Sequence, residues 1–131
     1  MKATIHRANS REEYWSSEGC HILEYLNSPE DPNLSLARAR VAPGVKTALH
    51  RLEGVTERYH LLAGRGVARL GSVETRELSA GDSVTIPAGV DQQIRNTGES
   101  DLVFLCICTP RFVPECYVAI EPAESAVQQR S

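Results

Sequence analysis

Short apolar runs separated by turn signals dominate the chain from residue 33 to residue 110. Several of these runs, among them LSLARARV and DSVTIP, alternate apolar and polar residues with the period of a strand, and none has a helical period. Glycine- and proline-containing turns recur roughly every ten residues between them. This pattern predicts a β-sandwich or barrel of short strands, and it excludes a mainly helical core.

The two ends of the chain lack this pattern. We expect one domain spanning 1–131, with a core barrel over about 33–110 and flanking segments at 1–32 and 111–131. Ser10 and Glu13 have the spacing of a capping box, which predicts one helical turn over 11–16. The polar tail over 121–131 is predicted to be frayed.

Charge and composition exclude several classes of partner. The formal net charge is −3, and there is neither the basic patch that nucleic acid requires nor a polybasic run for an anionic membrane. The first twenty residues contain no apolar stretch, and no window approaches the length of a membrane span. We therefore expect a cytoplasmic protein that binds neither nucleic acid nor membranes.

Four cysteines occur, but their spacing matches no CxxC metal or redox motif. Cys106 and Cys108 lie on one face of a predicted strand, where a disulfide between them would be strained. We interpret all four as reduced thiols that fill apolar space. A thiolate ligand for a metal from Cys106 or Cys108 is the alternative.

Two stretches with fixed spacing carry the strongest signal. The first reads PGVKTALHRLEGVTERYHLLAGRG, and the second reads GDSVTIPAGVDQQIRN. They resemble the two motifs of the cupin superfamily, G-x5-H-x-H-x3/4-E-x6-G and G-x5-P-x-G-x2-H-x3-N. The matching positions are Gly44, His50, Glu57 and Gly64 in the first, and Gly81, Pro87, Gly89 and Asn96 in the second. The resemblance is to small single-domain bacterial cupins, and it implies an all-β jelly-roll barrel, or double-stranded β-helix, of two antiparallel sheets.

The departures from the motifs concern the metal site. Family members with a full site hold a divalent metal on three histidines and one glutamate. Here Leu52 and Gln92 stand at two of the histidine positions. The resemblance leaves His50, Glu57 and the Gln92 amide oxygen as metal ligands, a set that binds transition metals poorly. We expect a divalent ion to be weakly bound or absent, and the sequence does not identify it.

Strand alternation gathers the remaining candidates into one pocket. His50 shares a strand face with Leu52, Glu57 with Tyr59, and Gln92 with Ile94. A few polar groups among apolar ones are typical of a small-molecule site. The candidate catalytic residues are Glu57, His50 and Tyr59, and the candidate substrate-binding residues are Gln92, Tyr59, Leu52 and Ile94. For Tyr59 the alternative is an aromatic core residue with no role in binding.

The orientation of the strand LSLARARV is left open by the sequence. Arg38 and Arg40 share one face, and Ala37, Ala39 and Val41 share the other. We favour small residues inside a roomy barrel and solvated arginines outside, because unpaired buried arginines are rare. If the arginines pointed inward, the ligand would be an anion.

Three classes of function fit the sequence. The first is a metal-assisted isomerase, lyase or cyclase acting on a small polar metabolite, such as a sugar derivative or a carboxylic acid, with Glu57, His50 or Tyr59 moving a proton. The second is a non-catalytic metabolite-binding or sensor protein without metal, which Leu52 and Gln92 favour. The third is a structural role. A homodimer is expected, because the segment with Tyr14 and Trp15, together with the strand that holds Tyr25, is apolar enough to cover a partner's sheet or the chain's own. Whether the chain is an enzyme stays open.

Overall fold

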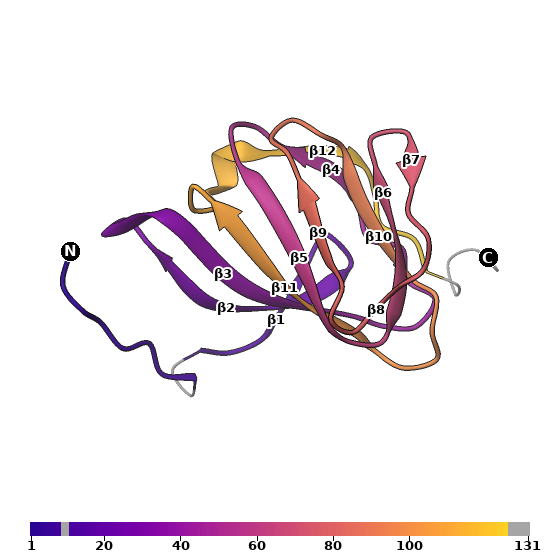
Figure 1. Ribbon diagram of the computed structural model, residues 1–131, viewed down its shortest axis with the longest axis horizontal. Helices are drawn as coiled ribbons and strands as arrows, with labels where there is room; N and C mark the ends of the chain where they lie inside the picture. The colour runs from indigo at the N-terminus through magenta and orange to yellow at the C-terminus, as the bar shows by residue number, and fades with distance from the viewer. Residues whose placement is uncertain (9–10, 126–131) are drawn as a thin grey trace.

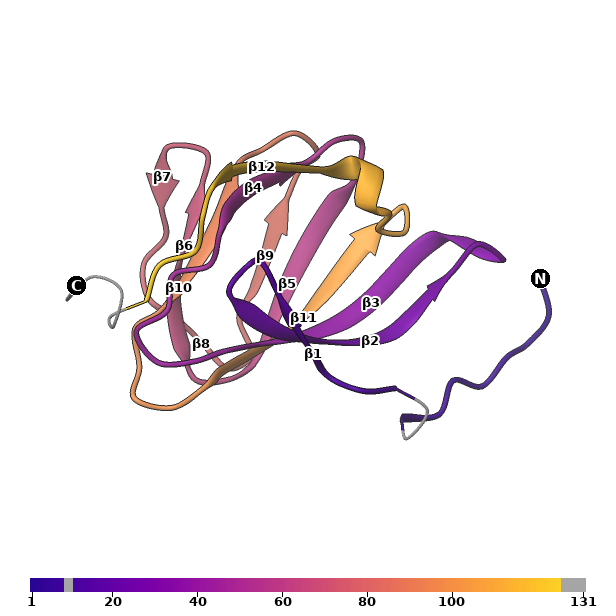
Figure 2. The same ribbon diagram turned by 180° about the vertical axis from the view of Figure 1, so that it is seen from behind.

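Two antiparallel sheets form the molecule in the computed structural model, which describes residues 1–8 and 11–125. The first sheet has the strand order β1 (Tyr14–Ser16), β2 (Cys20–Ser28), β3 (Asp31–Val41), β11 (Leu102–Thr109), β5 (Thr56–Ala63), β9 (Ser83–Ile86). The second has the order β12 (Tyr117–Glu121), β4 (Leu49–Leu52), β10 (Gln92–Asn96), β6 (Arg65–Leu70), β7 (Val73–Glu74), with β8 (Leu78–Ser79) paired to β6. The sheets face each other, with β1 and β2 at one end of the barrel (Figures 1 and 2). The predicted all-β jelly roll is confirmed.

Strand alternation places the core as the sequence predicts. Along β5, Glu57, Tyr59 and Leu61 are buried while the residues between them are partly exposed. β9 alternates in the same way, with Val84 and Ile86 turned inward. The core lies between the sheets, and its largest fully buried apolar side chains are Leu49, Leu61, Ile86, Ile94, Leu102 and Val41.

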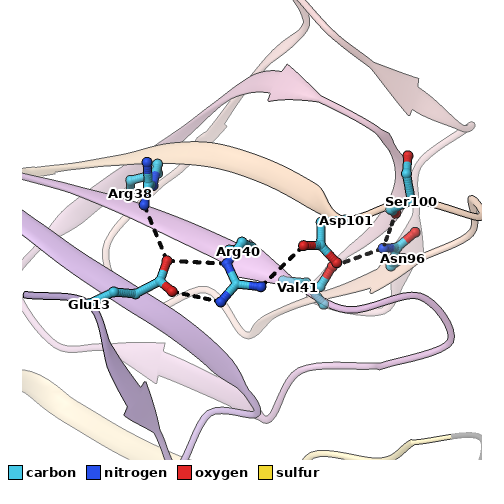
Figure 3. Close-up of polar contacts among 7 residues, drawn as sticks. All are labelled: Glu13, Arg38, Arg40, Val41, Asn96, Ser100 and Asp101. Carbon is cyan, nitrogen blue, oxygen red and sulfur yellow. Dashed lines mark hydrogen bonds and ion pairs between the residues drawn. The ribbon is translucent and has the colours of Figure 1, made fainter.

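The two arginines of β3 point away from the barrel interior. Ala39 and Val41 are buried in the core, whereas Arg38 and Arg40 meet the carboxylate of Glu13 on the outer face, as Figure 3 shows. Arg40 lies 2.6 Å from Glu13 and 3.1 Å from Asp101. Its hydrogen bond lowers the pKa of Glu13 to about 2. The preferred orientation of this strand is confirmed, although the arginines are paired as well as solvated.

The motif asparagine has a structural role beside this cluster. Asn96 is buried, and its Nδ2 donates to the carbonyl oxygens of Val41 and Ser100 at 2.9 Å each (Figure 3). Its Oδ1 accepts from the backbone N–H of Gly98 at 2.8 Å. The side chain therefore fixes the turn between β10 and β11 against the end of β3.

The sheets extend beyond the predicted core range of 33–110. β1 and β2 form a hairpin in which Tyr14 pairs with Ile22 and Ser16 with Cys20, so the helical turn predicted over 11–16 is wrong. Strand pairing across a tight turn at Gly19, where φ is +90°, outweighs the local capping signal.

The C-terminal segment also joins the barrel. β12 pairs with β4, and the backbone of Glu124 exchanges hydrogen bonds with Lys46 at 2.8 and 2.9 Å. The predicted fraying over 121–131 is therefore wrong for 121–124, while 126–131 lie outside the described residues. Within the described part of the chain, no helix is long and apolar enough to cross a membrane.

The first-motif glycine Gly64 provides a test of the fold. Its φ is +83°, and a Cβ there would lie 2.6 Å from the carbonyl oxygen of Asp101 and 2.9 Å from the Cα of Leu102. Gly71 also has positive φ, at +63°, but nothing lies within 4 Å of its Cβ position. Gly71→Ala should cost about 1–2 kcal/mol of unfolding free energy from backbone strain alone. Gly64→Ala should cost at least about 3 kcal/mol, because the strand backbone must shift as well. Urea unfolding of both variants measures the difference, and equal costs would contradict this packing.

Candidate functional site

A cavity of about 310 Å³ lies at the end of the barrel that carries the β1–β2 hairpin. β4 and β5 contribute His50, Leu52 and Glu57, and β11 contributes Cys106 and Cys108. Its remaining walls come from β1 to β3, from the turn that holds Glu18, and from residues 112–117. This volume lies at the small end of the range of about 300–1,000 Å³ for ligand sites.

Strand pairing determines which side chains meet around the cavity. Gln92 of β10 is the direct partner of His50 of β4. In the other sheet, Glu57 of β5 pairs with Cys108 of β11, and Tyr59 pairs with Cys106. The two cupin motifs are far apart in sequence, and this register brings them together as predicted.

Glu57 is the electrostatic centre of the site. Its carboxyl is buried, and this burial raises its pKa to about 8. The negative charge of Glu18 raises the pKa further, while hydrogen bonds from Cys108, Gln92 and Cys106 partly oppose the shift. The Cys108 thiol lies 3.6 Å from Oε2. Glu57 is therefore largely protonated at neutral pH and can donate a proton to a ligand.

Burial also keeps the neighbouring thiols protonated. It raises the pKa of both Cys106 and Cys108, and the charge of Glu57 raises each further. All four cysteines are free. Cys106 and Cys108 therefore act as neutral hydrogen-bond donors to the carboxyl group and not as nucleophiles.

His50 is held in one tautomer by the backbone. Its Nδ1 lies 3.0 Å from the carbonyl oxygen of Ala48, which can only accept, so Nδ1 carries the proton. The ring also stacks on Tyr117, with centroids 4.8 Å apart and an interplanar angle of 18°. In the neutral ring, the other nitrogen, Nε2, is the one that accepts a proton or a hydrogen bond.

Tyr59 and Gln92 support the site from the barrel interior. The buried Tyr59 hydroxyl donates to Gln92 Oε1, and burial raises the pKa of Tyr59 well above its usual range. This bond orients the amide so that its NH2 group is available to Glu57. Gln92 thereby links the phenol to the carboxyl group.

Five of the six predicted site residues line one of two cavities, and Gln92 lines neither. His50, Leu52 and Glu57 line the main cavity. Tyr59 and Ile94 line a recess of about 20 Å³ behind it, together with Glu57. Because Tyr59 and Gln92 are bonded to each other, a role in positioning Glu57 accounts for both. Their assignment as substrate contacts, together with that of Ile94, stays a prediction.

Sequence reasoning missed Glu18, which lines both the cavity and the recess. The β1–β2 turn carries it, and the backbone holds it in place: its carbonyl oxygen accepts from the N–H of Ala48 at 2.8 Å. Burial raises the pKa of Glu18, and the nearby His50 opposes this shift. The residue lies outside both motifs, and only recognition of a tight turn at Gly19 could have pointed to it.

The donor set does not fit a resident transition metal. Residues 1–8 and 11–125 contain no group of three or more His, Cys, Asp or Glu side chains that could hold a metal ion. Leu52 places a hydrocarbon at one family ligand position, and Gln92 Oε1 already accepts from Tyr59. Only His50 Nε2 and the Glu57 carboxyl remain from the predicted set, too few for a tetrahedral or octahedral site.

Fold and site together define a jelly-roll barrel in which a buried carboxyl group and an imidazole line one cavity. The chain belongs to the cupin family: residues 37–108 match the family model described as Cupin domain. It is 35% identical to an uncharacterized protein of Methanocaldococcus jannaschii over 108 residues, which are 78% of this chain and 82% of that one.

Other similar proteins include known small cupins. An oxalate-binding protein of Thermotoga maritima is 37% identical over 71 residues, which are 54% of this chain and 58% of that protein. The structure of a nucleoside dehydratase from Streptomyces superposes with a TM-score of 0.77 at 16% identity, covering 92% of this chain and 93% of that one. KdgF from Halomonas sp. superposes with a TM-score of 0.73, also at 16% identity, covering 85% and 96%. These two structural matches show the fold alone.

Restoring the two missing histidines tests the placement of the family positions. Leu52→His combined with Gln92→His should create a site with three histidines and Glu57, because Gln92 pairs directly with His50. Affinity for zinc or nickel should rise by orders of magnitude over that of the unmodified chain, which offers one imidazole. Calorimetry on protein purified without a metal-affinity tag measures both affinities. Adding Glu57→Gln should remove most of the gain, and equal affinities before and after restoration would contradict the placement.

Proposed function

We propose that this cupin is an acid–base enzyme of the isomerase or lyase type, working without a resident metal on a small polar metabolite. The observation that carries the proposal is that a carboxyl group able to donate a proton and an imidazole able to accept one line the same cavity. Glu57 is a buried acid with its pKa raised to about 8, and the contact of His50 Nδ1 with the Ala48 carbonyl makes Nε2 the proton acceptor of the neutral ring. General acid catalysis works best when the acid has a pKa near the working pH, as Glu57 does.

The two groups divide the proton transfer between them. His50 Nε2 removes a proton from a carbon or hydroxyl of the substrate, and Glu57 gives its proton to the oxygen on which charge develops. The substrate therefore loses one proton and gains another in this step. In the next step protonated His50 donates a proton and ionised Glu57 accepts one, which restores both residues. Tyr59 and Gln92 hold the Glu57 carboxyl in place, and the backbone of Ala48 holds the imidazole.

Cavity size supports a ligand about as large as a monosaccharide. A volume near 310 Å³ holds a ring with a few hydroxyl groups, and larger ligands would extend into solvent. Polar groups for orienting such hydroxyls are available on the wall, in Ser16, Ser17, Asn27 and Ser35. The apolar side chains Leu26, Leu36 and Phe112 would cover the ring faces.

A non-catalytic binding protein is the second candidate. Leu52 on the cavity wall favours it, because a hydrocarbon at that position supplies binding surface and no chemistry. The same cavity would then hold the metabolite without turning it over. Proton exchange at the ligand distinguishes the two candidates.

We retain the homodimer as part of the proposal. Tyr14 and Trp15 of the edge strand β1 are 48% and 63% exposed, which is unusual for side chains of this size. A second copy that covered this edge would bury both rings and pair the free backbone hydrogen-bonding groups along the edge strand β1.

Deuterium uptake tests the enzymatic proposal. A panel of aldoses, ketoses and nucleosides is incubated with the protein in D2O and followed by NMR. For any compound that exchanges, His50→Gln and Glu57→Gln should each slow exchange by about 10²–10⁴-fold while changing affinity much less. His60→Gln is the matched control, because that imidazole lies on the outer face, with Nδ1 2.7 Å from Ser83 Oγ. Undiminished exchange in the His50 variant would contradict the proposal, and binding without exchange would favour the second candidate.

A further inference from the structure

Three carboxyl groups and one imidazole lie on the cavity wall. Glu18, Glu24 and Glu57 line it, and no lysine or arginine of the described residues does. Arg38 and Arg40 lie on the opposite face of β3, paired with Glu13. The cavity therefore contains no fixed positive charge to meet a carboxylate or a phosphate.

One basic side chain does approach the rim. Arg111 Nη1 donates to Asn27 Oδ1 at 2.9 Å, and Asn27 belongs to the cavity wall. Its guanidinium is already engaged by that contact, and Arg111 itself is not part of the wall. An anionic ligand could still be held by Arg111 at the rim, so the experiment below includes a variant of this residue.

Aromatic rings lie among these carboxyl groups. Tyr14, Phe112 and Tyr117 line the same cavity as Glu18 and Glu24. The Tyr14 hydroxyl lies 3.5 Å from Glu24 Oε1, so a ring and a carboxyl group are adjacent at the mouth. Aromatic faces attract cations through the quadrupole of the ring, and carboxylates attract them by charge. Rings and acids around an enclosed volume are a typical arrangement for an organic ammonium group.

We propose that the cavity selects a ligand bearing a protonated amine, with Glu18 and Glu24 as the residues that bind the ammonium group. The inference rests on the proposed function in that it uses the same cavity. Glu57 remains the proton donor, because it lies against Cys106, Cys108 and Gln92 at the inner end. Glu18 is thus a specificity-determining residue carried by the N-terminal hairpin, and neither cupin motif includes it.

Two sets of probes of matched shape and different charge test this proposal. The first set is glucosamine, glucose and glucuronate, and the second is ethanolamine, ethylene glycol and glycolate. Binding to the full chain is measured by calorimetry and by ligand-detected NMR at neutral pH. In at least one set, the ammonium member should bind roughly 10- to 100-fold more tightly than the anionic member. Glu18→Gln should reduce that preference by about tenfold or more.

Two variants serve as controls. Glu99→Gln makes the same charge change at an exposed position outside the cavity and should leave the preference unchanged. Arg111→Gln should also leave it unchanged, because no anion is anchored there. Proton exchange is followed on the same samples: a preference for the ammonium probe without exchange contradicts the proposed catalysis alone, which separates failure of that proposal from failure of this inference. The proposal is overturned if no ammonium probe binds more tightly than its neutral and anionic counterparts, or if Glu18→Gln leaves the preference intact.

Discussion

Burial of the Glu57 carboxyl inside an apolar barrel is the constraint on which the rest of the site depends. An ionised carboxylate in such a place costs several kcal/mol unless it is paired, and none of the positive side chains of the described residues lines this cavity. This cost raises the pKa of Glu57 to about 8, and donors from Gln92, Cys106 and Cys108 offset only part of it. Tyr59 in turn orients Gln92. At the position where the motif resemblance implies a metal ligand, we propose that this chain uses a hydrogen-bonded acid.

The N-terminal hairpin adds a second carboxyl group, that of Glu18, to the cavity that Glu57 lines. The β1–β2 turn brings Glu18 beside Glu57 and His50, and the negative charge of Glu18 raises the pKa of Glu57. The backbone contact between Glu18 and Ala48 couples the hairpin to the strand that carries His50, since Ala48 also accepts from the imidazole. We therefore propose that specificity comes from the hairpin and chemistry from the two motifs.

The sequence predicted the barrel and its lining because both depend on local signals. Alternation placed His50, Glu57 and Gln92 inside, and the small residues Ala39 and Val41 favoured outward-pointing arginines without excluding the alternative; the structure confirms the favoured orientation. The hairpin at 14–28 was not predicted as part of the sheet, because its pairing depends on a partner strand and a tight turn that outweigh the helix cap signal. The contribution of Glu18 depends on that pairing, so it was also missed. The Tyr59–Gln92 bond could not be read from spacing, because it joins two sheets.

The ionisation of Glu57 is the measurement that tests this account most directly. Glutamate labelled with ¹³C at the side-chain carboxyl allows each group to be titrated by NMR, and the signal missing from Glu57→Gln identifies the residue. The account predicts a midpoint of about 8, because burial and the charge of Glu18 both disfavour the ionised form. A midpoint near the ordinary value of 4.5 would mean that Glu57 is ionised at neutral pH and cannot be the proton donor.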